Sequence, residues 1–150
     1  MNLYLRSMAG GFAATVVLSA LMVMKDAMGL MPALNVVTML SGMAHSMMGL
    51  PDVLAVGWLL HFMIGTVLWG MLFAAAYGWL PGQGAVAKGL WFSVWAWLMM
   101  MLLAMPMAGG GLFGLRLGMM APVMTLMLHL IWGAVLGVTV LKLAPRAAGC

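Results

Sequence analysis

Charged residues are what this sequence has least of. Only 5% of its 150 residues are charged, two of them acidic and six basic, whereas 67% are hydrophobic. A chain of this composition cannot cover itself with a water-facing surface. The composition therefore excludes a soluble globular protein and predicts an integral membrane protein.

Cysteine and catalytic motifs are also scarce. The single cysteine is Cys150, the last residue, so no intramolecular disulfide can form and stability must come from helix packing. No carboxylate lies within a long apolar run, and there is no nucleophile elbow, glycine-rich phosphate loop or His-Glu-x-x-His pair. These absences predict a protein that is not an enzyme.

Long uncharged runs are what the sequence does contain. Four of them reach the roughly 20 residues that a helix needs to cross a hydrocarbon core of about 30 Å. Their continuous apolar character favours helices over barrel strands, which alternate between apolar and polar residues. We expect residues 1–150 to form one all-α domain, a polytopic membrane four-helix bundle. The predicted helices cover approximately residues 7–25, 54–78, 88–106 and 122–143.

The distribution of basic residues predicts the orientation. With four crossings, most of them lie on the side of both termini, at Arg6, Lys88, Lys142 and Arg146. The opposite side holds Lys25 and Arg116 together with both acids. The positive-inside rule then places both termini in the cytoplasm of a bacterial inner membrane protein. The basic residues form no cluster, so the expected partner is the lipid bilayer and not nucleic acid.

The two connections on the other side of the membrane are long and apolar. Asn35–Met48 suits a short helix lying at the membrane interface, and the glycine-rich Met107–Gly114 suits a re-entrant or capping loop. Irregular backbone at that depth persists only where protein or a wet cavity covers it. We therefore expect a lid over this end of the bundle.

Two histidines stand in matched sequence frames, His61–Leu68 and His129–Leu136. An imidazole inside hydrocarbon is costly and by default marks a functional site. Gly11–Val16 also resembles Gly89–Val94, which is compatible with two tandem parallel two-helix repeats related by an axis along the membrane normal. Chance similarity between apolar segments is the alternative.

Both histidines lie on stripes of small residues spaced by four, which permit close helix packing and predict that both imidazoles point into the bundle. The glycines of these stripes are Gly57, Gly65, Gly133 and Gly137. One interpretation is that each imidazole only makes an interhelical hydrogen bond, worth about 0.6 kcal/mol in a membrane. Another is that His61 and His129 are the axial ligands of a haem b, with the glycines making room for the macrocycle. Only Lys25 and Arg116 offer charge to the haem propionates.

Methionine provides a third candidate site. There are 21 methionines, and Met105 and Met107 lie near His129 in the predicted bundle. Thioethers together with an imidazole suit Cu(I). Methionine also fills irregular gaps between helices, so a scattered excess equally fits packing.

Four segments of the chain resemble a bacterial family of small methionine- and glycine-rich four-helix membrane proteins, known only as a domain of unknown function. The segments are Thr15–Met22, His61–Leu68, Met105–Gly109 and Ala121–Thr125. The resemblance covers nearly the whole chain. It implies a bacterial inner membrane protein and transfers no catalytic residue.

Small size and the lack of aqueous domains lead us to expect a structural or accessory subunit of a larger membrane complex. Such a subunit docks on a membrane-protein partner or on further copies of itself through its glycine-rich helix faces. A protein that binds haem or Cu(I) in its own right is the alternative. A channel or carrier for a small solute is the third hypothesis.

Overall fold

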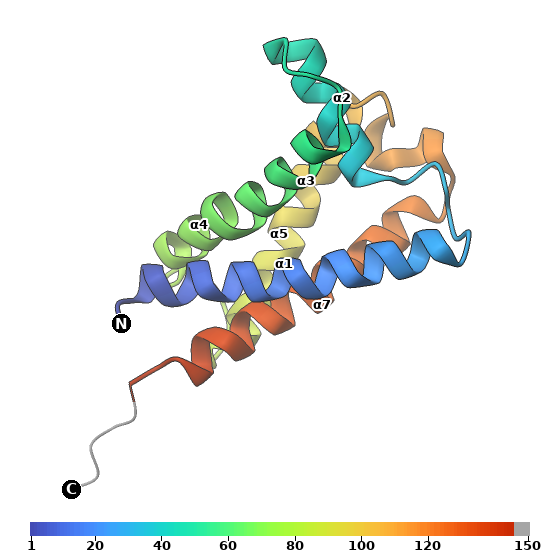
Figure 1. Ribbon diagram of the computed structural model, residues 1–150. Coiled ribbons are helices and arrows are strands. Elements are labelled where there is room, and N and C mark those ends of the chain that lie inside the picture. The colour runs from blue at the N-terminus through green and yellow to red at the C-terminus, as the bar shows by residue number, and fades with distance from the viewer. Residues whose placement is uncertain (146–150) are drawn as a thin grey trace, which may run out of the picture.

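The computed structural model describes residues 1–145 and is helical, with no strand in that part of the chain. Figure 1 shows the spans crossing one another, with α2 and the turns around η3 at the end of the bundle away from both termini. The all-α prediction is confirmed. Arg146 and Cys150, which entered the orientation and disulfide arguments, lie outside the described residues. The elements are α1 (Leu3–Ala27), α2 (Val36–Met48), α3 (Leu54–Met63), η1 (Ile64–Leu68), α4 (Trp69–Ala76), α5 (Gly84–Met99), η2 (Met100–Ala104), α6 (Met105–Met107), η3 (Leu112–Leu117) and α7 (Ala121–Lys142).

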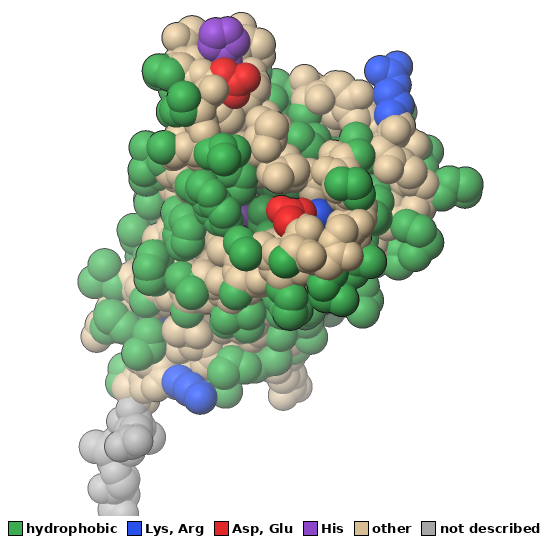
Figure 2. Space-filling model, turned by 45° about the vertical axis from the view of Figure 1, so that its right-hand side comes forward, with side chains coloured by type: hydrophobic (Ala, Val, Ile, Leu, Met, Phe, Trp, Pro, Cys, Tyr) green, Lys and Arg blue, Asp and Glu red, His purple; other side chains and the backbone are tan. Residues whose placement is uncertain are grey.

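Four continuous helices are long and apolar enough to cross a membrane, as predicted. Two of them are the single helices α1 and α7, whereas α3, η1 and α4 join into the second span and α5, η2 and α6 into the third. Large hydrophobic side chains are exposed along all four spans. Figure 2 shows hydrophobic side chains over much of one face and few charged ones. A surface of this kind contacts lipid, so the protein is membrane-embedded.

The helix starts differ from those predicted because charged residues were taken as boundaries. α1 begins at Leu3 and not at residue 7, since the Asn2 side chain accepts a hydrogen bond from the Leu5 N–H (2.9 Å) and caps the helix. The third span begins at Gly84 and not at residue 88. Lys88 lies inside the helix and turns its ammonium back to the Tyr77 carbonyl oxygen, so its charge does not end the helix.

The short helix predicted between the first two spans is α2. Its N-terminus is capped by Asn35, whose side chain accepts from the Thr38 N–H (3.0 Å), and it ends at Gly49 in the left-handed conformation. Gly57 of α3 lies so close to the Val37 carbonyl oxygen that there is no room for a Cβ. The Ser41 hydroxyl donates to Asp52 Oδ1 (2.6 Å) just before α3. These contacts hold α2 against the start of the second span.

The glycine-rich segment after the third span forms turns and the 3₁₀ helix η3. Gly109, Gly111 and Gly114 adopt positive φ, which allows the chain to fold back on itself. Phe113 of η3 packs with Met101 and Met105, which are both buried. The segment therefore covers the end of the third span, as a capping loop does.

The two halves of the chain make the same internal contact. In the first half, Gly11 lies against the Gly65 carbonyl oxygen with no room for a Cβ. In the second half, Gly133 and Gly89 lie against each other's carbonyl oxygens in the same way. The sequence comparison had aligned Gly11 with Gly89 and Gly65 with Gly133. The packing within each half thus follows the repeat.

Packing between the halves does not follow the repeat. α1 packs along α7, and we call this interface the closed seam. The Trp132 indole N–H donates to Thr15 Oγ1 across it (3.2 Å), and both side chains are buried. A two-fold axis would pair the second span with α5 in the same way, but α4 barely touches α5. We call that second interface the open seam.

Aromatic rings bridge the open seam only toward the end that carries the termini. The Phe92 ring of α5 lies 5.8 Å from the Trp69 ring and 5.3 Å from the Phe73 ring of α4, measured between centroids. Phe73, Phe92 and Trp132 belong to the main buried cluster of the bundle. Beyond this cluster, toward α2, α3 and η1 of the second span make almost no contact with α5 and η2 of the third.

Candidate functional site

A cavity of about 450 Å³ lies beyond the aromatic cluster, and its lining comes from all four spans and from α2. Trp69 and Trp132 lie at the side of the aromatic cluster, while Met39 and Met43 of α2 line the opposite side. The cavity is within the size range of small-molecule sites, and its lining is predominantly apolar, as in such sites. The cavity lies in the open seam, where the second span and α5 would pack together if this interface matched the closed seam.

His61 and His129 both line this cavity, so the bundle brings the two predicted histidines to one site. His61 is 8% exposed, and its Nε2 is buried without a hydrogen-bond partner among the described residues. Its ring is flanked edge-on by Trp58 (5.9 Å) and Phe62 (5.8 Å), neither of which satisfies that nitrogen. A buried polar atom left without a partner costs about 1–3 kcal/mol. His61 therefore lines the cavity through other ring atoms, while its Nε2 is enclosed by the fold.

His129 is held in one tautomer by its own helix. Its Nδ1 lies 2.8 Å from the Thr125 carbonyl oxygen. A carbonyl oxygen can only accept, so Nδ1 carries the hydrogen and donates it. In the neutral ring Nε2 then has no hydrogen and presents a lone pair. The same arrangement orients histidines that bind metals through Nε2.

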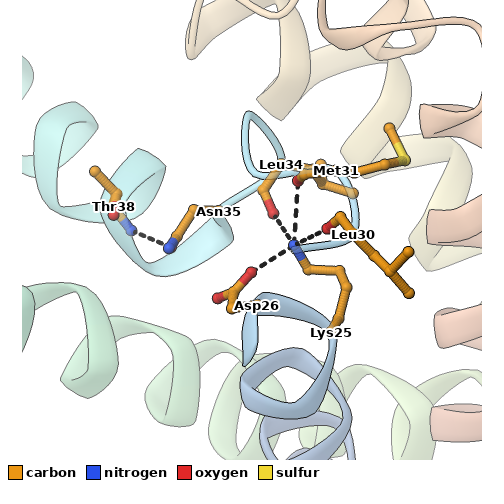
Figure 3. A network of polar contacts seen from close by, with 7 residues as sticks. All are labelled: Lys25, Asp26, Leu30, Met31, Leu34, Asn35 and Thr38. Atoms are coloured by element: carbon orange, nitrogen blue, oxygen red, sulfur yellow. Dashed lines mark hydrogen bonds and ion pairs between the residues drawn. The ribbon is translucent and has the colours of Figure 1, made fainter. Parts of the chain in front are cut away.

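Lys25 also lines the cavity, and its charge is fully engaged (Figure 3). The buried ammonium donates to the carbonyl oxygens of Leu30 (3.1 Å), Met31 (3.2 Å) and Leu34 (2.9 Å), and it pairs with Asp26. Lysine near a helix C-terminus is well placed to bind such unpaired carbonyls. Lys25 thus holds the connection between α1 and α2 in place and has no donor left for a ligand.

The threonines of the lining are engaged as well. Thr15 accepts the Trp132 indole N–H, as described for the closed seam. Thr125 Oγ1 accepts from the Trp97 indole N–H (3.1 Å) and donates to the Ala121 carbonyl oxygen (2.7 Å). Lys25 and both threonines of the lining thus have partners within the fold, whereas the Nε2 of His129 has no partner among the described residues.

The cavity opens sideways, between the second and third spans. Leu68 of η1 and Leu103 of η2 both line it, yet they are 50% and 56% exposed. Both segments are π-helical, η1 on one wall and η2 on the other. Single π-helical turns are rare and occur frequently at functional sites. The cavity thus reaches the apolar surface between these two spans, and it also reaches the end of the bundle near α2, where the lining residues Met107 and Asp26 are exposed.

The proposed copper ligands Met105, Met107 and His129 also line the cavity, but they are unequally available. Met105 is 1% exposed and packs beneath the glycine-rich segment, with its sulfur beside Gly110 and Gly114. Met107 is 56% exposed. Within residues 1–145 no three His, Cys, Asp or Glu side chains gather to hold a metal ion.

The remaining predicted residues lie apart from the cavity or support its walls. His45 is at the exposed end of α2, where its Nδ1 donates to the Leu50 carbonyl oxygen (2.8 Å). Gly65 lines the cavity and abuts Thr15, while Gly137 lies against the Ala85 carbonyl oxygen in the second half. Sequence reasoning missed the two π-helical walls, for which the sequence carries no signal that we recognise. It also missed the capping role of Lys25, which its position at the end of an apolar run indicated.

A family model described as a family of unknown function (DUF6789) matches residues 1–149. Comparison with curated proteins finds no match, and comparison with solved structures finds none either.

Proposed function

Since the chain belongs to the DUF6789 family, whose function is unknown, we propose a function from the site alone: a membrane protein that holds a small hydrophobic ligand between His61 and His129. The observation that carries this proposal is the cavity that His61 and His129 both line, in which His129 keeps its Nε2 lone pair while its Nδ1–H is donated to Thr125. A packing role alone would leave the lone pair of His129 Nε2 without a partner, whereas a ligand with a hydrogen-bond donor would satisfy it.

The protein acts, in this proposal, without catalysing a reaction, as an accessory subunit that presents or stores its ligand for a membrane partner. The lack of aqueous domains supports this role, as does the fact that the one carboxylate in a span, Asp26 in the last turn of α1, is paired with Lys25. The proposed location is a bacterial inner membrane, with both termini in the cytoplasm, and the excess of basic residues on the terminal side supports that orientation.

Haem b is the second candidate, and the tautomer of His129 favours it. With Nδ1–H donated to Thr125, His129 Nε2 would be able to bind iron, and His61 on the same cavity would be the second ligand once its enclosed Nε2 is uncovered. Two facts oppose it. The Lys25 ammonium lines the cavity but is already bound by carbonyls and by Asp26, and Arg116 is exposed in η3, so neither is available to a propionate.

Absorption spectra of the purified protein, oxidised and dithionite-reduced, together with metal analysis and mass spectrometry of an organic extract, test both candidates. We expect a colourless protein whose extract contains a specific hydrophobic molecule that is lost from the His61→Ala/His129→Ala double variant and retained by His45→Ala. Sharp reduced haem bands would replace this candidate with haem b. An extract identical for all three proteins, without pigment or metal, would refute ligand binding at the histidine pair.

A further inference from the structure

The proposed function does not specify the chemical class of the ligand. The polar groups that line the cavity restrict which classes can bind. The charged groups in the lining, Lys25 and Asp26, are paired with each other, and Lys25 has three further carbonyl partners. A charged ligand in this cavity would find no counter-charge to repay the loss of its hydration. The lining therefore fits an uncharged ligand.

The histidines define the polar end of that ligand. Because His129 donates its Nδ1–H to Thr125, its neutral Nε2 can only accept a hydrogen bond. The head group of the ligand must then carry an O–H or N–H donor. His61 lines the same cavity and packs beside the head group, but its Nε2 is enclosed by the fold and is not an attachment point.

The opening of the cavity indicates where the apolar part of the ligand would lie. Leu68 and Leu103 flank an opening between the second and third spans and are themselves exposed to lipid. A hydrocarbon chain attached to a head group at the histidines could leave through this opening into the bilayer without meeting a polar side chain. Entry from the membrane would use the same route.

Resting on the proposed function, the geometry points to an uncharged lipid with a hydroxylated head group, of the quinol type. Its hydroxyl donates to His129 Nε2, and its chain passes between Leu68 and Leu103 into the bilayer. The lone pair of His129 distinguishes the reduced from the oxidised form, since a quinone has no hydroxyl to donate. The site thus prefers the quinol.

The test compares an alkyl-substituted benzoquinol with its dimethyl ether, which has the same chain and ring but no hydroxyl. Each is incubated anaerobically with the full-length protein in nanodiscs, and the retained ligand is quantified by mass spectrometry above an empty-nanodisc background. We expect the quinol to bind about tenfold more tightly than the ether, the effect of one lost hydrogen bond. His129→Ala should abolish that difference, and His45→Ala, which changes a histidine outside the cavity, should preserve it.

Leu103→Trp tests the route of the chain, because an indole there should obstruct the mouth and weaken binding of quinol and ether alike. Unchanged elution and thermal unfolding identify variants that are folded. Equal binding of quinol and ether would overturn the inference of a donating head group while leaving the proposed function intact. A haem spectrum would overturn both this inference and the first candidate function in favour of haem b. Failure of both probes, together with an extract that holds no specific ligand, would overturn the proposed function as well.

Discussion

The closed and open seams are built from corresponding parts of the two halves, yet only one of them is filled. Along the closed seam, α1 and α7 touch closely, with Gly10 against Leu136 and Trp132 bonded to Thr15. Along the open seam, aromatic rings bridge the spans at one end, and a cavity with two histidines occupies the other. The difference teaches that two halves with the same internal packing enclose a cavity when one of the two interfaces between them stays unfilled.

The largest expected effect comes from forcing the closed seam apart with Gly10→Leu. A Cβ on Gly10 would lie 3.0 Å from the Leu136 carbonyl oxygen, and a larger side chain cannot be accommodated without moving α1. We expect the free energy of unfolding to fall by about 3 kcal/mol, at the upper end for overpacking. Unfolding by SDS titration in mixed micelles measures it. An unchanged midpoint would show that the closed seam is not tightly packed.

Removing the Lys25 ammonium should weaken the lid next to the open seam. Lys25→Met leaves three carbonyl oxygens without their donor, and we expect a loss of about 1–3 kcal/mol. Lys142→Met is the matched control, because Lys142 lies at the other end of the bundle, in the last turn of α7. Both variants are compared by the same SDS titration. Equal midpoints for the two would contradict the capping role of Lys25.

A smaller effect is expected from the single hydrogen bond across the closed seam. Thr15→Val keeps the side chain's shape but removes the acceptor of the Trp132 N–H, which should cost about 0.6–1.7 kcal/mol. Ser19→Ala serves as the control, since the Ser19 hydroxyl bonds only to the Thr15 carbonyl of its own helix. If the two substitutions change the unfolding midpoint equally, the interhelical hydrogen bond does not contribute to the free energy of unfolding.

The smallest effect on stability is expected where the open seam has room. Ala104→Leu adds a larger side chain at a residue that lines the cavity, and we expect the free energy of unfolding to change by less than about 0.5 kcal/mol. The same SDS titration compares the unfolding midpoint of Ala104→Leu with that of Gly10→Leu. A loss as large as that of Gly10→Leu would mean that the cavity is not available space.

Much of this architecture could be predicted from the sequence. Uncharged runs revealed four spans, and the stripes of small residues indicated that His61 and His129 face the interior, where both line the cavity. Asn35 and the glycine after Met48 mark the ends of α2 in the sequence as in the fold. These features are local, so the period of a helix and the chemistry of its caps suffice to find them.

The open seam could not be predicted. An apolar side chain looks the same whether it faces lipid, a neighbouring helix or a cavity, so the sequence does not say which helix pairs fill their interface. The π-helical turns at Ile64–Leu68 and Met100–Ala104 change the register of the walls without any proline or glycine pattern in common. The orientation argument counted Lys25 only as a charge, whereas its carbonyl partners lie up to nine residues further along the chain.

Native mass spectrometry of the protein released from its own membrane tests most directly whether the open seam holds a ligand at the two histidines. The account predicts that wild-type protein and His45→Ala carry one bound small molecule, and that the His61→Ala/His129→Ala variant appears as the bare chain. Wild-type protein without a bound molecule, or a molecule retained equally by all three proteins, would contradict it.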